Sequence, residues 1–236
     1  MFHSRKTLDL RLKVVELPVI KLSLRRSNAI RWTNSLLLAR LGIKRDPVSR
    51  LPILDPGHAS GFQPFALRPW QATGVQWMFS QESELIRGGI VADACGMGKT
   101  PTALTLIFLD AKRRSEDPNA VFRPNLIVVP SMIFYVWFDE IKSRFGDAIE
   151  LNLFYGWKEI LPEFESDPKF LLGVDEREID RLARAVAALD PKRPHTAFTV
   201  FLTTYNTWRM CQYETERGTL LLSETVRITF IDTANY

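Results

Sequence analysis

Cysteine and histidine are scarce in this chain of 236 residues, which contains two of the former and three of the latter. Cys95 and Cys211 are too few for a disulfide framework, so the chain fits a reducing compartment. The histidines stand far apart, at His3, His58 and His195, and no Cys/His spacing matches a zinc site. These shortages exclude a disulfide-stapled domain and a Cys/His metal centre.

Long apolar runs are missing as well. The longest apolar stretch, residues 125–138, covers 14 positions and contains Pro130, whereas a membrane-spanning helix needs about 20 residues. The sequence therefore predicts no transmembrane segment. A composition of 46% hydrophobic and 25% charged residues is typical of a globular protein and argues against disorder throughout the chain.

Acidic residues are rare among the first 50 positions, which hold 12 Lys/Arg against 3 Asp/Glu although the whole chain carries only +4. Such a basic arm suits nucleic acid or an anionic surface. Three interpretations stay open: a solvated or nucleic-acid-contacting extension, the remnant of an upstream domain, and an Arg-rich targeting signal. Asp9 and Glu16 interrupt the arm early, which disfavours the targeting signal.

Prolines and glycines cluster near residues 46–68, which predicts a linker or an extended strap. We therefore expect a basic extension with a Pro-rich linker over residues 1–65 and one domain over 66–236. Within that domain helical and strand patterns alternate, with strands predicted at 89–92, 125–129, 151–154, 199–203 and 228–231. This alternation predicts an α/β fold in three layers, with a mostly parallel sheet covered on both faces.

The sharpest local signal is the segment GGIVADACGMGKT, which ends at Thr100 and reads as a strand, a glycine-rich loop and the start of a helix. Gly96 and Gly98 allow backbone N–H groups to approach phosphate oxygens, and the helix points its positive end at the same anion. Lys99 would reach the β- and γ-phosphates of a nucleotide, and the Thr100 hydroxyl would hold Mg²⁺. Because Asp93 replaces the first glycine of the generic pattern, the alternative is a glycine-rich turn with an accidental Gly-Lys-Thr.

About 20 residues upstream stands the segment LRPWQATGVQWM, which runs from Leu67 to Met78. It resembles the adenine-recognition motif of the SWI/SNF-type helicase-like ATPases of helicase superfamily two. The phosphate loop of that family reads Asp-Glu-Met-Gly-Leu-Gly-Lys-Thr. This chain departs from it at Ala94, Cys95 and Met97 and matches it at Asp93, Gly96, Gly98, Lys99 and Thr100.

Three later segments resemble further motifs of the same family in the same order, so the resemblance spans residues 67–236. They are LIVVPS with Trp137, Glu140 and Phe145 downstream, the strand and turn at 151–156, and the triplet at 203–205. The resemblance implies the first RecA-like helicase lobe, preceded by a basic irregular extension. It also implies ATP and Mg²⁺ as cofactors, double-stranded DNA or chromatin as partner, a role in chromatin remodelling or DNA repair, and a nuclear location.

The same resemblance assigns roles to individual residues. Gln71 would pair with the adenine edge, unless it is a glutamine on a helix surface. Lys99 and Asp232 would act in catalysis, and Asp232 would bind Mg²⁺ together with Thr100. Ser131 and Thr204 would donate to DNA phosphates, although capping of the helices that follow them is equally compatible with their positions. The predicted nucleotide-binding set is Gln71, Gly96, Met97, Gly98, Lys99 and Thr100.

The pattern breaks at its last motif, where the family has Asp-Glu-Ala-His and this chain has Asp232, Thr233, Ala234 and Asn235. Thr233 cannot act as a carboxylate base, and losing a general base costs roughly 100- to 10,000-fold in rate. The family's second lobe, with its arginine fingers, is not seen in this sequence. We therefore expect an ATP-binding lobe with weak or absent hydrolysis. A non-catalytic regulatory module that binds nucleotide or DNA is the alternative, and a phosphate-loop kinase is disfavoured by the upstream glutamine motif.

Overall fold

The computed structural model describes residues 35–57, 64–85, 88–155, 170–172, 182, 184–208 and 227–230. The predictions for the basic arm up to residue 34 and for Asp232, Thr233 and Asn235 fall outside these ranges. None of the helices in the described ranges has the length and apolar character needed to cross a membrane.

A five-stranded sheet forms the centre of the domain, in the order β6-β5-β7-β4-β8, with every neighbouring pair parallel. Every residue of β4 and β7 is buried, as expected for strands of a parallel sheet that is covered on both faces. The predicted parallel sheet is thus confirmed. Its strands are β4 (Asn125–Val129), β5 (Glu150–Tyr155), β6 (Phe170–Leu172), β7 (Thr199–Thr204) and β8 (Arg227–Phe230).

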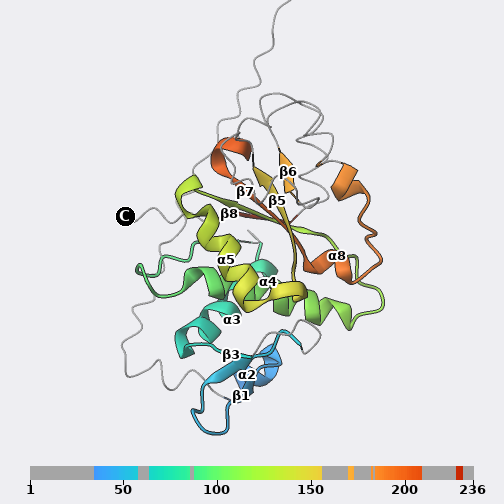
Figure 1. The fold of residues 1–236 in the computed structure, drawn as a ribbon. Helices are drawn as coiled ribbons and strands as arrows, with labels where there is room; N and C mark the ends of the chain where they lie inside the picture. Colours follow the sequence, from blue (N-terminus) through green and yellow to red (C-terminus); the bar gives the residue numbers. More distant parts are fainter. Residues whose placement is uncertain are drawn as a thin grey trace, which may run out of the picture.

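Helices cover both faces of this sheet, because alternate side chains of β4 enter two different clusters. Ile127 and Val129 pack with residues of the three long helices, which lie together on one side in Figure 1. Leu126 and Val128 pack with Leu182, Val186 and Trp208 on the other side. The domain therefore has the three layers that the sequence predicted. The three long helices are α3 (Pro69–Ser83), α4 (Lys99–Ser115) and α5 (Phe134–Arg144).

Helix α4 is the most deeply buried of these helices, with residues 101–111 all buried. Pro101 stands in its first turn, where the missing N–H would have no partner within the helix. Three basic side chains in the last turn complement the negative end of the helix dipole. Packing against the rest of the domain therefore surrounds α4 on all sides. This packing fixes the position of its first turn, which directly follows the glycine-rich loop.

Residues 35–66 are more regular than the sequence predicted. Helix α2 (Ser35–Leu41) precedes a small antiparallel sheet of β1 (Lys44–Arg45), β2 (Pro52–Leu54) and β3 (Phe65–Ala66). The described part of the expected linker thus contains two strands. The reason is the apolar content of this region: four of its side chains are buried in the same core as α3 and α4, namely Leu38, Leu41, Ile43 and Leu54.

The strand predicted at 89–92 is not formed. Residues 88–94 have no regular secondary structure, and Ile90 is 76% exposed. An apolar run makes a strand only where a neighbouring strand supplies hydrogen bonds and packing, so strand propensity depends on context. No strand among the described residues pairs with this segment, and an irregular stretch leads into the glycine-rich loop instead.

Candidate functional site

The glycine-rich loop turns at two glycines in the left-handed region, since Gly96 and Gly98 both have a φ of 80°. Gly98 is the N-cap of α4, and a β-carbon there would lie 2.3 Å from Gln71 Nε2. The positive φ therefore favours glycine at this position, and a larger residue would also displace the end of the Gln71 side chain. Asp93, Ala94, Cys95 and Gly96 are exposed, so the loop is open to a ligand from solvent.

Two consecutive side chains at the start of α3 hold the end of this loop. Trp70 Nε1 donates to the carbonyl oxygen of Met97 at 3.0 Å, and Gln71 Nε2 donates to that of Gly98 at 3.3 Å. The other end of the Gln71 amide accepts from the Arg68 N–H at 2.7 Å. Gln71 is only 8% exposed, so the alternative of a glutamine on a helix surface is wrong.

The contact of Trp70 with the loop was not predicted from the sequence. The two partners are 27 positions apart, and the sequence showed Trp70 only as the aromatic residue of the motif that resembles an adenine site. Trp70 is half-buried in the structure, and an indole N–H in such a place usually finds an acceptor, but the sequence does not indicate which acceptor it takes.

Lys99 folds back over the loop it follows. Its Nζ donates to the carbonyl oxygens of Asp93 at 2.8 Å and of Ala94 at 3.3 Å. The ammonium therefore lies against the loop backbone, at the start of α4, where the helix dipole also favours an anion. A phosphate group at this place would meet a positive charge and the N–H groups of the first helical turn, which have no partner within the helix.

The first turn of α4 fixes the direction of these N–H groups. The carbonyl oxygen of Gly98 accepts from Thr102 Oγ1 at 2.7 Å and from the Thr102 N–H at 3.1 Å, in addition to Gln71. Thr100 is half-buried beside them. Its hydroxyl is the member of the predicted Mg²⁺ set that the structure describes, since Asp232 lies outside the described residues.

Ser131 lies just after β4 and Thr204 is the last residue of β7. The two strands are neighbours, and their ends are in register at Val129 and Thr204. The sheet thus brings both residues to one edge. Thr204 is 1% exposed and caps the helical residues 205–208, because its Oγ1 accepts from the Thr207 N–H at 3.3 Å. Ser131 is exposed and caps neither η2 (Ser131–Ile133) nor α5. The capping alternative is confirmed for Thr204 and wrong for Ser131, where a proline and an isoleucine hold the cap positions.

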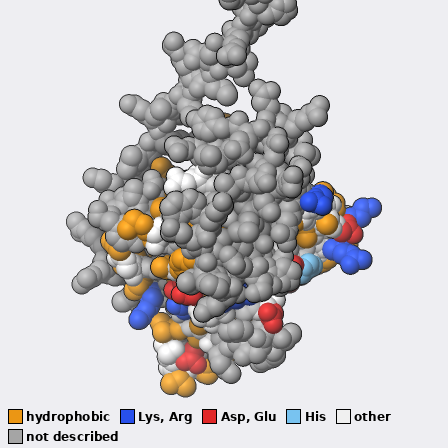
Figure 2. Space-filling model, turned by 45° about the horizontal axis from the view of Figure 1, so that its top comes forward, with side chains coloured by type: hydrophobic (Ala, Val, Ile, Leu, Met, Phe, Trp, Pro, Cys, Tyr) orange, Lys and Arg blue, Asp and Glu red, His pale blue; other side chains and the backbone are white. Residues whose placement is uncertain are grey.

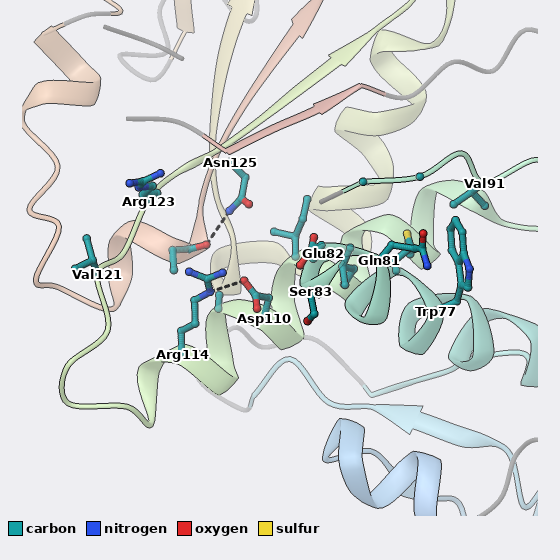
Figure 3. A pocket seen from close by; sticks show the side chains of 17 residues that line it. Trp77, Gln81, Glu82, Ser83, Val91, Asp110, Arg114, Val121, Arg123 and Asn125 are labelled. Carbon is teal, nitrogen blue, oxygen red and sulfur yellow. Dashed lines mark hydrogen bonds and ion pairs between the residues drawn. The ribbon is translucent and has the colours of Figure 1, made fainter. Parts of the chain in front are cut away.

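A cavity of about 910 Å³ lies elsewhere in the domain, between α3, α4 and the segment that leads to the loop. Figure 3 shows Trp77, Asp110 and Arg114 at its wall, with Asp110 joined to Arg114. None of its lining residues belongs to the loop at 93–98. This cavity is therefore separate from the candidate phosphate site.

Charged side chains of both signs share the surface. On the face that Figure 2 shows, Lys and Arg side chains of the described residues stand beside Asp and Glu side chains. Some of these opposite charges pair with each other, as Arg193 does with Asp190 and His195 does with Glu150. In the part of the chain that the structure describes, no group of three or more His, Cys, Asp and Glu residues is placed to hold a metal ion.

A parallel three-layer α/β domain with a glycine-rich loop at the start of a buried helix is a phosphate-loop domain of the RecA-like class. The SNF2-related domain matches residues 70–231, which is more than half of the chain. The chain therefore belongs to the SNF2-related family.

Several curated relatives support this assignment. ATP-dependent helicase rhp16 of Schizosaccharomyces pombe is 33% identical over 90 residues, which cover 38% of this chain and 9% of that protein. Protein CHROMATIN REMODELING 25 of Arabidopsis thaliana is 32% identical over 158 residues, covering 63% and 15%. DNA repair and recombination protein RAD54-like of Gallus gallus is 24% identical over 185 residues, covering 77% and 22%. The chain thus spans less than a quarter of the length of these relatives.

Proposed function

We propose that this chain is the ATP-binding lobe of a DNA-dependent, helicase-like ATPase that acts in chromatin remodelling or DNA repair, in the nucleus. The observation that carries the proposal is the loop at 93–98, which turns at Gly96 and Gly98 and ends at the start of a buried helix. The names of the relatives, which describe helicases, chromatin remodelling and DNA repair, support the DNA-directed part.

The described residues fit ATP with Mg²⁺. Glycine at position 98 allows the left-handed turn of the loop, and it places no side chain between the loop backbone and a phosphate. A larger residue would also meet the Gln71 side chain. Lys99 supplies the positive charge, and Thr100 supplies a hydroxyl oxygen, a ligand type that Mg²⁺ accepts. Bound Mg²⁺ would neutralise phosphate charge. In this proposal Gln71 reads the adenine edge, and to do so it exchanges at least one of its two present hydrogen bonds.

Hydrolysis by this chain is weak or absent in our proposal, because Thr233 stands where the family has the carboxylate that activates water. Asp232 still offers a carboxylate for Mg²⁺. The chain would therefore bind Mg²⁺–ATP even where it does not hydrolyse it. The same observation favours a second candidate function: a regulatory module that binds nucleotide or DNA without turnover.

DNA binding is proposed through the edge where β4 and β7 end. Ser131 is exposed there and would donate to a DNA phosphate, a contact that positions DNA without reading its sequence. Thr204 lies at the same edge, but its oxygen caps the next helix and is buried. Ser131 is therefore the stronger candidate of the two.

The proposal is tested by titrating a fluorescent ATP analogue with Mg²⁺ against the chain and its Lys99→Ala variant, each checked for a cooperative melt. We expect saturable binding by the chain and a loss of about tenfold or more in the variant, because a hydrogen-bonded charge is removed from the phosphates. Lys112→Ala, which removes a cation from the last turn of the same helix, is the matched control and should bind like the unchanged chain. Equal binding by all three proteins, or no binding by a folded chain, would overturn the nucleotide proposal.

DNA-stimulated hydrolysis separates the two candidate functions. A measurable ATPase rate that rises with double-stranded DNA supports the motor lobe. A flat rate together with nucleotide binding supports the regulatory module. Small phosphate acceptors serve as the control, because a phosphate-loop kinase would respond to them and not to DNA.

A further inference from the structure

Trp70 has a polar contact that no role assigned above uses. Its indole N–H donates to the carbonyl oxygen of Met97 at 3.0 Å, across 27 positions of sequence. Trp70 is only half-buried, and the contact joins the first turn of α3 to the last residue of the loop before Gly98. The bond therefore connects α3 to the glycine-rich loop and belongs to the secondary structure of neither. We call this bond between Trp70 and Met97 the strut.

The peptide geometry gives this strut a consequence for the ligand side of the loop. In a planar trans peptide the carbonyl and the N–H point in opposite directions. When Trp70 holds the carbonyl of Met97 toward α3, the N–H of Gly98 in the same peptide points away from α3. Gln71 and Thr102 act in the same way on the next peptide, whose N–H belongs to Lys99.

Fixing these two peptides removes rotations that a glycine-rich loop would otherwise keep. Gly98 can adopt several backbone conformations at little cost, so a free loop would lose entropy each time it bound an anion. A loop already held in one conformation binds more tightly for the same contacts. The strut therefore acts on affinity without touching the ligand.

We infer that Trp70 is a positioning residue for phosphate binding: through its bond to Met97 it presents loop N–H groups to the phosphates, whatever base the nucleotide carries. This inference rests on the proposed nucleotide binding. It differs from the role implied for Gln71, because an adenine contact would discriminate between bases and a strut on the loop would not.

The test uses the full chain and its Trp70→Phe variant, which keeps the aromatic ring and loses the N–H. Calorimetric titrations with Mg²⁺ and ATP, GTP or inorganic tripolyphosphate measure three affinities for each protein. We expect all three to fall by the same factor, about three- to tenfold, as for one hydrogen bond. Trp137→Phe makes the same change on α5, where the indole N–H has no hydrogen-bond partner among the described residues, and it should leave all three affinities within about twofold.

Two results would overturn the inference: unchanged affinities in Trp70→Phe, or a loss for ATP with tripolyphosphate unaffected, which would mean that the indole contacts the base. If the variant does not fold, the indole N–H resonance of Trp70 in the unchanged chain gives the answer. It should be protected from hydrogen exchange both in the free chain and at saturation with tripolyphosphate, and a rapidly exchanging indole N–H in the free chain would contradict a strut. Loss of binding in Lys99→Ala with full binding in Trp70→Phe removes this inference alone, whereas no binding by the unchanged chain removes both proposals.

Discussion

Gly98 and Gln71 approach each other so closely that a side chain at position 98 would have to displace the amide end of the Gln71 side chain. A β-carbon on Gly98 would lie 2.3 Å from Gln71 Nε2 and 3.4 Å from Pro101 Cγ. The φ of 80° at Gly98 is a second obstacle, because side chains rarely adopt it. The backbone conformation therefore favours glycine, and any side chain at this position would also displace the Gln71 amide.

The Gly98→Ala substitution should weaken binding of the fluorescent ATP analogue by about tenfold or more. The left-handed conformation costs a non-glycine residue about 1–3 kcal/mol, and the collision displaces Gln71 as well. Gly42→Ala is the matched control, because Gly42 has a φ of 65° with nothing within 4 Å of a β-carbon. It should lower the free energy of unfolding by about 1 kcal/mol and leave nucleotide affinity unchanged. Equal affinities in the two variants would show that the contact with Gln71 is unimportant.

Thr233→Glu should raise the ATPase rate, on the order of 100-fold, because it restores a carboxylate where the family has one. Thr233→Gln has a similar size without the charge and should stay at the starting rate. Adding Lys99→Ala to the active variant should abolish the gain, since the phosphates would no longer be held. A Thr233→Glu variant as slow as the Gln variant would mean that the missing carboxylate does not limit hydrolysis.

Nucleotide should protect Cys95 from alkylation, because this cysteine lies exposed within the loop. The experiment uses a Cys211→Ser background and a maleimide reagent, with the rate followed by mass spectrometry. At a concentration of Mg²⁺–ATP ten times the Kd, the rate should fall about tenfold by mass action alone. In the Lys99→Ala variant the same nucleotide concentration should lower the rate by about twofold or less, because the Kd rises by about tenfold or more. An unprotected Cys95 in a saturated chain would place the nucleotide elsewhere.

Thr204→Ala should lower the free energy of unfolding by about 1–2 kcal/mol. The substitution removes the acceptor for the Thr207 N–H and the partner of the buried Thr207 hydroxyl, which lies 3.0 Å away. Thr204→Ser keeps the oxygen and should retain most of the stability in urea denaturation. An alanine variant as stable as the serine variant would show that this cap contributes nothing.

Ser131→Ala should leave stability within about 0.5 kcal/mol, because the hydroxyl is exposed and caps no helix. If the edge of β4 and β7 binds DNA, the same variant should lower DNA affinity about threefold, as for one lost hydrogen bond. Fluorescence anisotropy with a labelled duplex measures this change. Ser143→Ala on the exposed side of α5 is the matched control, because it removes the same hydroxyl without changing the charge. An unchanged affinity in Ser131→Ala would remove this residue from the proposed interface.

The elements that sequence patterns predicted well are those with a strong local signal. The run at Asn125–Val129 is buried at every position and is apolar after its first residue, so its burial could be predicted without knowing its neighbours. Apolar residues recur at helical spacing from Phe134 to Phe145, and Trp137, Ile141 and Phe145 on this stripe are all fully buried. In such segments the hydrophobic period alone decides the structure.

What sequence patterns did not predict depends on distant partners. Ile90 lies in an apolar run, but a strand needs a neighbour that the run itself does not specify. Leu54 stands among prolines and still reaches the core, because the fold brings it under α3 and α4. The bond from Trp70 to Met97 belongs to the same class, since only the packing of α3 against α4 brings the two residues together.

The burial of residues 101–111 in α4 has a consequence for how this sequence tolerates change. A helix with one solvent-exposed face accepts substitutions at every third or fourth position, so the positions that tolerate substitution repeat with the helical period. In α4 the intolerant positions should form one unbroken block, with no such rhythm. A library of all single substitutions, sorted for folded chains, would thus locate the helix that carries the phosphate loop from survival data alone.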